Sequence, residues 1–142
     1  MRVTDIREKA VSLSDPMSNA GISYLQMTAS AVAIDIDAGE KGPVTGYGFS
    51  SVGRYAQSGL ITERFAPRLR AAEDISGVGG GLDPVRGWAV MMANEKPGGD
   101  GDRAGAVGVL DMALWDAAAK IEGIPLWQLL SERFNKDKAH ER

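Results

Sequence analysis

The chain has 142 residues, of which 44% are hydrophobic and 25% are charged, the composition of an ordinary globular domain. Its formal net charge of -3 disfavours a nucleic-acid partner, because a nucleic-acid surface needs clustered Lys and Arg. The absence of cysteine excludes disulfides and thiolate metal sites, and no stretch approaches the roughly 18 apolar residues of a membrane helix. We therefore expect a cytoplasmic protein with no membrane contact.

The first half of the chain has the pattern of three strands. Residues 3–13 hold apolar side chains in imperfect alternation, and residues 27–37 alternate cleanly. One face of that second strand would carry Ser30, Val32, Ile34 and Ile36. A third short strand is expected at 44–49, where Gly46 and Gly48 either weaken the strand or let another backbone come close. Three successive strands with short connections predict an antiparallel meander.

The second half has helical spacing. A first apolar stripe comprises Leu60, Ile61, Phe65 and Leu69. Pro67 lies inside that stripe and predicts a kink or break near Ala66. Asp83 and Pro84 predict the start of a second helix, which the glycine-rich segment 97–102 would end.

The longest helix is expected over residues 103–121, with Gly123 as its C-terminal cap, and a short helix over 126–134. The apolar stripe of the longest helix would comprise Val107, Leu110, Leu114, Ala118 and Ile121. Strands followed by helices predict an α+β domain over residues 1–134, a three-stranded meander followed by a helical bundle. The charged residues 135–142 would form a tail.

Few residues of the chain are suited to acid–base chemistry. The single histidine, His140, lies in the charged tail, so only lysines or paired carboxylates remain in the body. Asp111 and Asp116 are poorly placed to share a metal, because a separation of five turns their side chains apart on a helix. We expect them to cap or to hydrogen-bond neighbouring elements. Core positions are expected for Trp88, Met91, Met92, Trp115 and Trp127.

Two polar loops are candidates for a binding rim. Residues 14–21 and 50–59 are connections with turn-forming and polar residues, and each adjoins an expected strand. Lys96 stands beside the glycine-rich segment, whose two acidic residues disfavour a phosphate. It could meet a substrate carboxylate as a point charge, although an ordinary solvated lysine is the alternative.

The segment 104–130 carries a pattern of well-spaced residues. It contains Ala113-Leu114-Trp115-Asp116, Ala119-Lys120, Gly123, Pro125-Leu126 and Leu129-Leu130. This pattern resembles the signature that closes the N-terminal capping domain in the mandelate racemase and muconate lactonizing branch of the enolase superfamily. The expected order of strands and helices is similar as well. Within that branch, residues 46–55, 91–99 and 104–130 most resemble the D-tartrate dehydratases.

The resemblance implies a hydro-lyase (dehydratase) of a hydroxy dicarboxylate or sugar acid. Such enzymes remove the proton next to a carboxylate, stabilise the enediolate on Mg²⁺ and expel water. A C-terminal (β/α)₈ barrel supplies the Lys and His acid–base pair and the metal ligands, while the cap selects the substrate. The full-length enzyme is expected to be a homo-oligomer. A barrel takes about 250 residues and none follows here, so we expect the chain alone to hold no catalytic or metal-binding residue and to be inactive.

The resemblance also singles out substrate contacts in the cap. Asn19, Tyr55 and Lys96 match the family pattern, and Arg54 is a weaker candidate. Two alternatives stay open: a stand-alone, non-catalytic binding module, and the cap of a racemase or of another sugar-acid dehydratase. The sequence predicts neither over the other, because one fold supports many chemistries in this branch.

Overall fold

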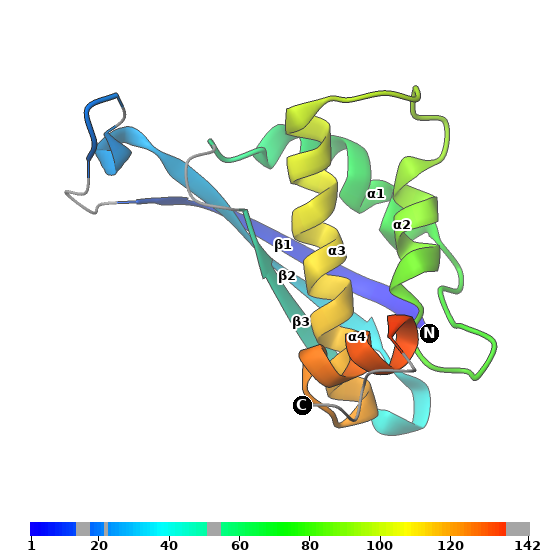
Figure 1. Ribbon diagram of the computed structural model, residues 1–142. Helices are drawn as coiled ribbons and strands as arrows, with labels where there is room; N and C mark the ends of the chain where they lie inside the picture. Colours follow the sequence, from blue (N-terminus) through cyan, green and yellow to red (C-terminus); the bar gives the residue numbers. More distant parts are fainter. Residues whose placement is uncertain (14–17, 22, 51–54, 136–142) are drawn as a thin grey trace.

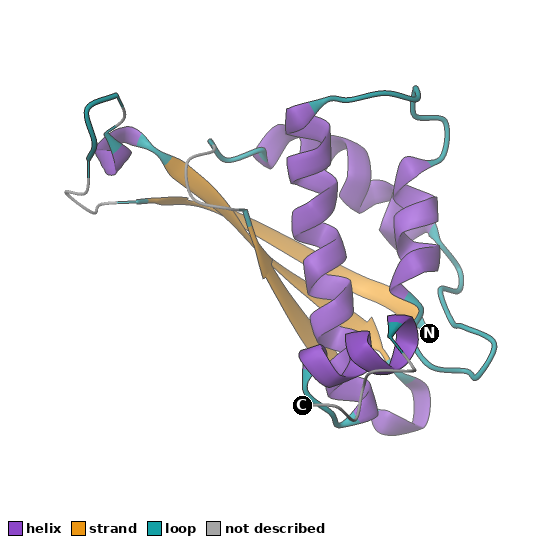
Figure 2. Cartoon of the chain, viewed as in Figure 1, coloured by secondary structure: helices purple, strands orange, loops and turns teal. Residues whose placement is uncertain are grey.

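A computed structural model describes residues 1–13, 18–21, 23–50 and 55–135. The strands β1 (Arg2–Ser12), β2 (Thr28–Asp37) and β3 (Pro43–Phe49) form one antiparallel sheet in the order β1-β2-β3. The α-helices come after the strands in the chain, and the longest of them lies across the sheet (Figures 1 and 2). The predicted α+β meander with a helical bundle is confirmed.

Strand β2 buries the face that its sequence pattern predicts, whereas Val11 in the apolar run of β1 is 42% exposed. In β2 the buried residues are Ser30, Val32, Ile34 and Ile36. The irregular pattern of β1 has a cause in its pairing, because the register with β2 shifts between Val3 and Asp5. Such a bulge adds one residue and reverses the alternation, so Val3 and Ile6 face the same core although they are three positions apart.

The chain stays helical across the predicted break near Ala66, and only the type of helix changes there. A π-helix, η3 (Leu60–Phe65), runs directly into α1 (Ala66–Ala71). Pro67 lies directly after this change of helix type, and its missing N–H leaves the helical hydrogen-bond ladder one donor short there. Two 3-10 turns, η1 (Tyr24–Gln26) and η2 (Gly39–Lys41), lie in the strand connections.

Carboxylate caps set the starts of the next two helices. Asp83 caps α2 (Pro84–Met92) by accepting from the Val85 N–H at 3.1 Å. Asp100 caps α3 (Gly101–Glu122) by accepting from the Arg103 N–H at 3.0 Å. The predicted start at residue 103 is therefore two residues late. The Asp100 cap lets the helix begin at Gly101 in spite of the low helix propensity of glycine.

The C-terminal end of α3 follows the prediction. Gly123 ends it in the left-handed region, with φ 71°, and α4 (Leu126–Phe134) follows. The buried face of α3 includes all five residues of its predicted apolar stripe.

The core expectation is wrong for two tryptophans. Met91 is fully buried, but Trp88 is 48% exposed and Trp127 is 69% exposed. In α2 the inward positions are taken by Pro84, Gly87 and Met91, so Trp88 lies beside the buried stripe and not in it.

Helix α3 lies very close to β3 because two glycines face it. A Cβ atom at Gly46 would lie 2.0 Å from the carbonyl oxygen of Ala113, and one at Gly48 would lie 2.2 Å from that of Val109. No side chain fits in that space. The interpretation that these glycines let another backbone come close is therefore confirmed.

Candidate functional site

The predicted binding segments lie at one end of the molecule, opposite the start of β1 and the end of α3. The β1–β2 connection, the segment after β3 and the α2–α3 loop all lie in the upper part of Figure 1. We call this the loop end, and it carries Asn19, Tyr55 and Lys96. The β1–β2 connection projects well beyond the helices, so the three candidates lie on separate segments and not in one compact cluster. Arg54 lies outside the described residues.

Asn19 and Tyr55 differ in how they are held. The Asn19 Oδ1 accepts from the Gly21 N–H at 3.0 Å, a local turn that orients the amide. Tyr55 is 64% exposed, so its ring and hydroxyl are presented to solvent.

A buried carboxylate next to Lys96 holds the α2–α3 loop in place. The Glu95 side chain is only 2% exposed and is surrounded by three arginines. Arg64 binds it through Nε at 3.0 Å and Nη2 at 2.9 Å, and Arg68 donates from Nη1 at 2.9 Å. Arg103 approaches it to 3.5 Å. Since these arginines come from η3, α1 and α3, one carboxylate fastens the loop to three helical segments.

Arg103 also fixes the backbone on which Lys96 stands. Its Nη1 donates to the carbonyl oxygen of Lys96 at 2.9 Å, and its Nη2 donates to that of Gly98. The Lys96 side chain itself is exposed. The main chain of Lys96 is therefore held while its side chain is exposed, which leaves its charge accessible to a carboxylate ligand.

The Glu95 cluster predicts a specific acid sensitivity. Burial would raise the pKa of Glu95, but hydrogen bonds and charge from Arg68 and Arg64 outweigh it and hold the pKa below 4.5. The stability that ionised Glu95 contributes is therefore complete above pH 4.5 and is lost as the pH falls through the lowered pKa. We expect Glu95→Gln to melt below the wild type at pH 7, with a difference in Tm that shrinks at lower pH.

Thermal unfolding of both proteins between pH 7 and about pH 2.5, the range in which a carboxylate titrates, checks this expectation. Glu40→Gln, which changes an exposed carboxylate in η2, is the matched control and should leave Tm unchanged. A Tm difference for Glu95→Gln that is constant with pH would contradict the prediction.

Sequence reasoning missed this cluster. The available signal is the spacing of Arg64 and Arg68, four residues apart on a helical segment, which places both on one face. Nothing in the sequence indicates that the shared partner is Glu95, because that pairing depends on how the segments pack.

Asp116 has the structural role expected of it, whereas the hydrogen-bond partner of Asp111 is Trp115 in the same helix. Asp116 accepts from the Tyr47 N–H at 2.8 Å and from the Lys120 Nζ at 2.6 Å. Lys120 also donates to the carbonyl oxygen of Thr45 at 2.9 Å. Asp116 and Lys120, which both belong to the family signature, thus satisfy backbone groups on the free edge of β3. Burial raises the pKa of Asp111, and a hydrogen bond with Trp115 opposes that rise.

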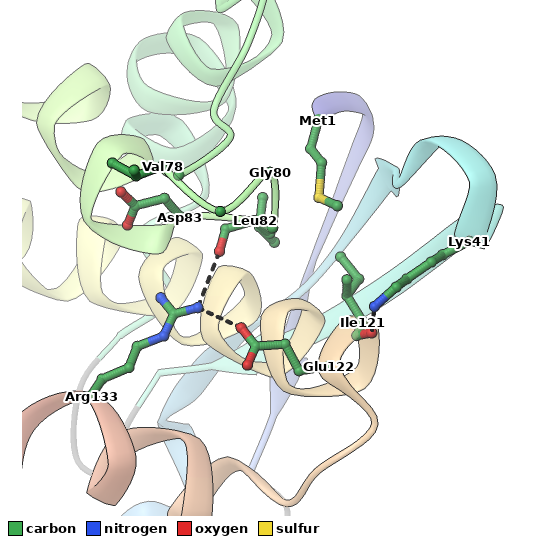
Figure 3. Close-up of a pocket in the computed structure, with 12 residues that line it drawn as sticks. Met1, Lys41, Val78, Gly80, Leu82, Asp83, Ile121, Glu122 and Arg133 are labelled. Carbon is green, nitrogen blue, oxygen red and sulfur yellow. Dashed lines mark hydrogen bonds and ion pairs between the residues drawn. The ribbon is translucent and has the colours of Figure 1, made fainter. Parts of the chain in front are cut away.

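A cavity of about 550 Å³ lies at the opposite end, between the glycine-rich segment 77–81 and the end of α3 (Figure 3). Its cationic side chains are engaged in holding the fold. Arg133 donates to Glu122 at 2.6 Å, and Lys41 donates to the carbonyl oxygen of Ile121 at 2.7 Å. The cavity therefore offers a carboxylate ligand little free charge, and the loop end is the better candidate site.

Within the described ranges, no three His, Asp or Glu side chains gather closely enough to hold a metal ion. Nor does that part of the chain contain a helix of the length and apolar character needed to cross a membrane.

Comparison with known proteins agrees with the fold. Residues 1–131 match the sequence model of the mandelate racemase / muconate lactonizing enzyme N-terminal domain. A mandelate racemase/muconate lactonizing enzyme-like protein from Rubrobacter xylanophilus is 24% identical with a TM-score of 0.57, over 89% of this chain and 32% of that one. A candidate isomerase from Sinorhizobium meliloti is 21% identical with a TM-score of 0.56, over 91% and 37%.

At these identities the solved structures show the fold alone, and the chain spans 32% and 37% of their lengths. The family assignment depends on the sequence match, which covers nearly every described residue. The chain belongs to the mandelate racemase/muconate lactonizing enzyme N-terminal domain family of the enolase superfamily.

Proposed function

We propose that this chain is the substrate-selecting cap of a Mg²⁺-dependent hydro-lyase, with D-tartrate or a related sugar acid as substrate. The observation that carries the proposal is Lys96, an exposed ammonium group on a main chain held by Arg103 and next to a buried ion cluster. A cation held in this way suits the distal carboxylate of a hydroxy dicarboxylate.

The other loop-end residues have complementary roles in this proposal. The Asn19 amide and the Tyr55 hydroxyl supply hydrogen bonds to substrate hydroxyls, and Arg54 supplies a second cation. Mg²⁺, bound by a C-terminal barrel, supplies charge stabilisation next to the reacting carboxylate. The cap itself binds and orients, and the barrel holds the Lys and His that move protons. The complete enzyme is a homo-oligomer in this proposal, and the chain alone does not turn over substrate.

Assay of the complete gene product tests the proposal. Loss of water from D-tartrate gives oxaloacetate, so malate dehydrogenase with NADH reports dehydration directly. We expect turnover of D-tartrate, or of another member of an acid-sugar panel, to require Mg²⁺ and to be absent for residues 1–142 alone. Change of optical rotation without loss of water would favour a racemase instead. No conversion of any panel member would favour a non-catalytic binding module.

A further inference from the structure

Three buried polar side chains gather at the root of the segment that carries Tyr55. Ser30 is 0% exposed, Ser50 is 4% exposed and Gln57 is 7% exposed. Ser30 belongs to β2, Ser50 follows β3 directly, and Gln57 precedes η3. A polar group in a core costs free energy unless it is hydrogen-bonded. The Gln57 Oε1 has no hydrogen-bond partner among the described residues, so the role of the three residues depends on the bonds that their other groups form.

Ser30 bonds both sides of that segment. Its carbonyl oxygen accepts from the Ser50 N–H at 2.9 Å, and its own N–H donates to the Ser50 Oγ at 2.8 Å. Its hydroxyl accepts from the Gln57 N–H at 3.0 Å. Next to it, the Thr28 hydroxyl accepts from the Ala56 N–H at 3.0 Å. Ser30 therefore bonds Ser50, which precedes Tyr55 in the chain, and Gln57, which follows it.

Helix α3 supports the same place from the other side. A Cβ atom at Gly105 would lie 3.1 Å from the Gln57 Oε1 and 3.2 Å from its Nε2, so glycine makes room for the buried amide. Gln57 is thus enclosed between β2 and the first turns of α3. The ordinary role of such contacts is to pair buried backbone groups, and a hydroxyl in a strand often does no more than that.

We propose that Ser30 is a positioning residue, whose hydroxyl sets the place of Tyr55 through the Gln57 N–H. The two bonds to Ser50 use the backbone groups of Ser30 and do not depend on its side chain. The substrate contact of Tyr55 belongs to the proposed function, and this inference rests on it. The hydrogen bonds of Ser30 do not depend on the proposed function, so the role of Ser30 and the proposed function can be tested separately.

Amide hydrogen exchange on the chain tests the hydrogen bonds. Ser30→Ala should speed exchange at Gln57 about tenfold or more, because the buried N–H loses its acceptor, with Ile34 and Leu110 unchanged. Ser30→Thr keeps the hydroxyl and should keep the protection. Thr45→Val is the matched control, since its hydroxyl bonds Asp35 on the same sheet at 2.7 Å and far from Gln57 in sequence. Unchanged exchange at Gln57 in Ser30→Ala would overturn the proposal.

A second variant covers the case in which Ser30→Ala does not fold. Thr28→Val removes the acceptor of the Ala56 N–H and leaves Ser30 intact. It should speed exchange at Ala56 and leave Gln57 protected. Equal loss of protection at both amides would mean that the segment opens as a whole, and would overturn a specific role for Ser30.

Kinetics of the complete gene product test the positioning. Ser30→Ala should raise KM about tenfold with kcat within twofold, the pattern of lost substrate binding, and Ser30→Thr should restore KM. A variant that only unfolds a fraction of the molecules lowers the apparent kcat at constant KM, and that result would overturn the proposal. If the wild type turns over no acid sugar, the proposed function fails, while hydrogen exchange still decides the role of Ser30.

Discussion

Gly46→Ala is expected to destabilise the domain more than any other single methyl group added to it. The added Cβ would meet the Ala113 carbonyl oxygen at 2.0 Å and the Ala117 N at 2.8 Å, and both are backbone atoms of α3. Backbone in the middle of a helix cannot yield as a side chain does, so α3 would have to move away from β3. We expect a loss of about 3 kcal/mol or more in the free energy of unfolding, and a fall in Tm of about 10 °C.

Gly108→Ala is the matched control on the helix itself. Gly108 lies in the middle of α3, and nothing lies within 4 Å of the place where its Cβ would be. Alanine there should stabilise the domain by about 0.5–1 kcal/mol, because it favours the helix and meets no neighbour. Chemical and thermal unfolding followed by circular dichroism measures both variants. A Gly46→Ala domain as stable as the wild type would show that α3 does not lie against β3 as described.

The elements that could be predicted from sequence are those with a local cause. The clean alternation of β2, the Asp83 cap and the Gly123 stop each depend on neighbouring residues, and each is where the pattern places it. The bulge in β1 depends on pairing with β2, so the only sign of it in the sequence is the imperfect alternation of apolar and polar residues. For Gly46 the sequence left two interpretations open, because only the packing of α3 decides between them.

The exposed tryptophans show the limit of the same reasoning. An apolar residue on a short helix is buried only if another element covers that side. Trp88 lies beside the buried stripe of α2, and no sequence pattern states which flank of that stripe is covered.

The candidate site could be predicted only in part. The family pattern indicates Lys96, but the arginines that hold the neighbouring Glu95 come from η3, α1 and α3. Ser30 stood in the sequence as one polar residue on an otherwise apolar strand face, which is the signal that could have marked it. Contacts between segments far apart in the chain depend on the fold, so residue types and spacing could not predict them.

Lys96→Ala is expected to reduce kcat/KM of the complete gene product about 100-fold, the loss of one hydrogen-bonded charge pair with the substrate. Most of the change should lie in KM, because the distal carboxylate binds in the ground state as well as in the transition state. Lys96 is exposed, so Tm should stay constant. Lys9→Ala, at an exposed lysine of β1, is the control and should keep wild-type kinetics.

Ionic strength separates the charge of Lys96 from its shape. An exposed cation that attracts a dicarboxylate is screened by salt, so the wild-type KM should rise as salt is added. Lys96→Ala should lose most of that salt dependence, whereas Lys96→Arg should keep it with a KM between the two, since a guanidinium retains the charge but not the compact shape. If all three proteins respond to salt alike, Lys96 does not bind the substrate carboxylate, and its place on the Arg103-held loop has a structural purpose only.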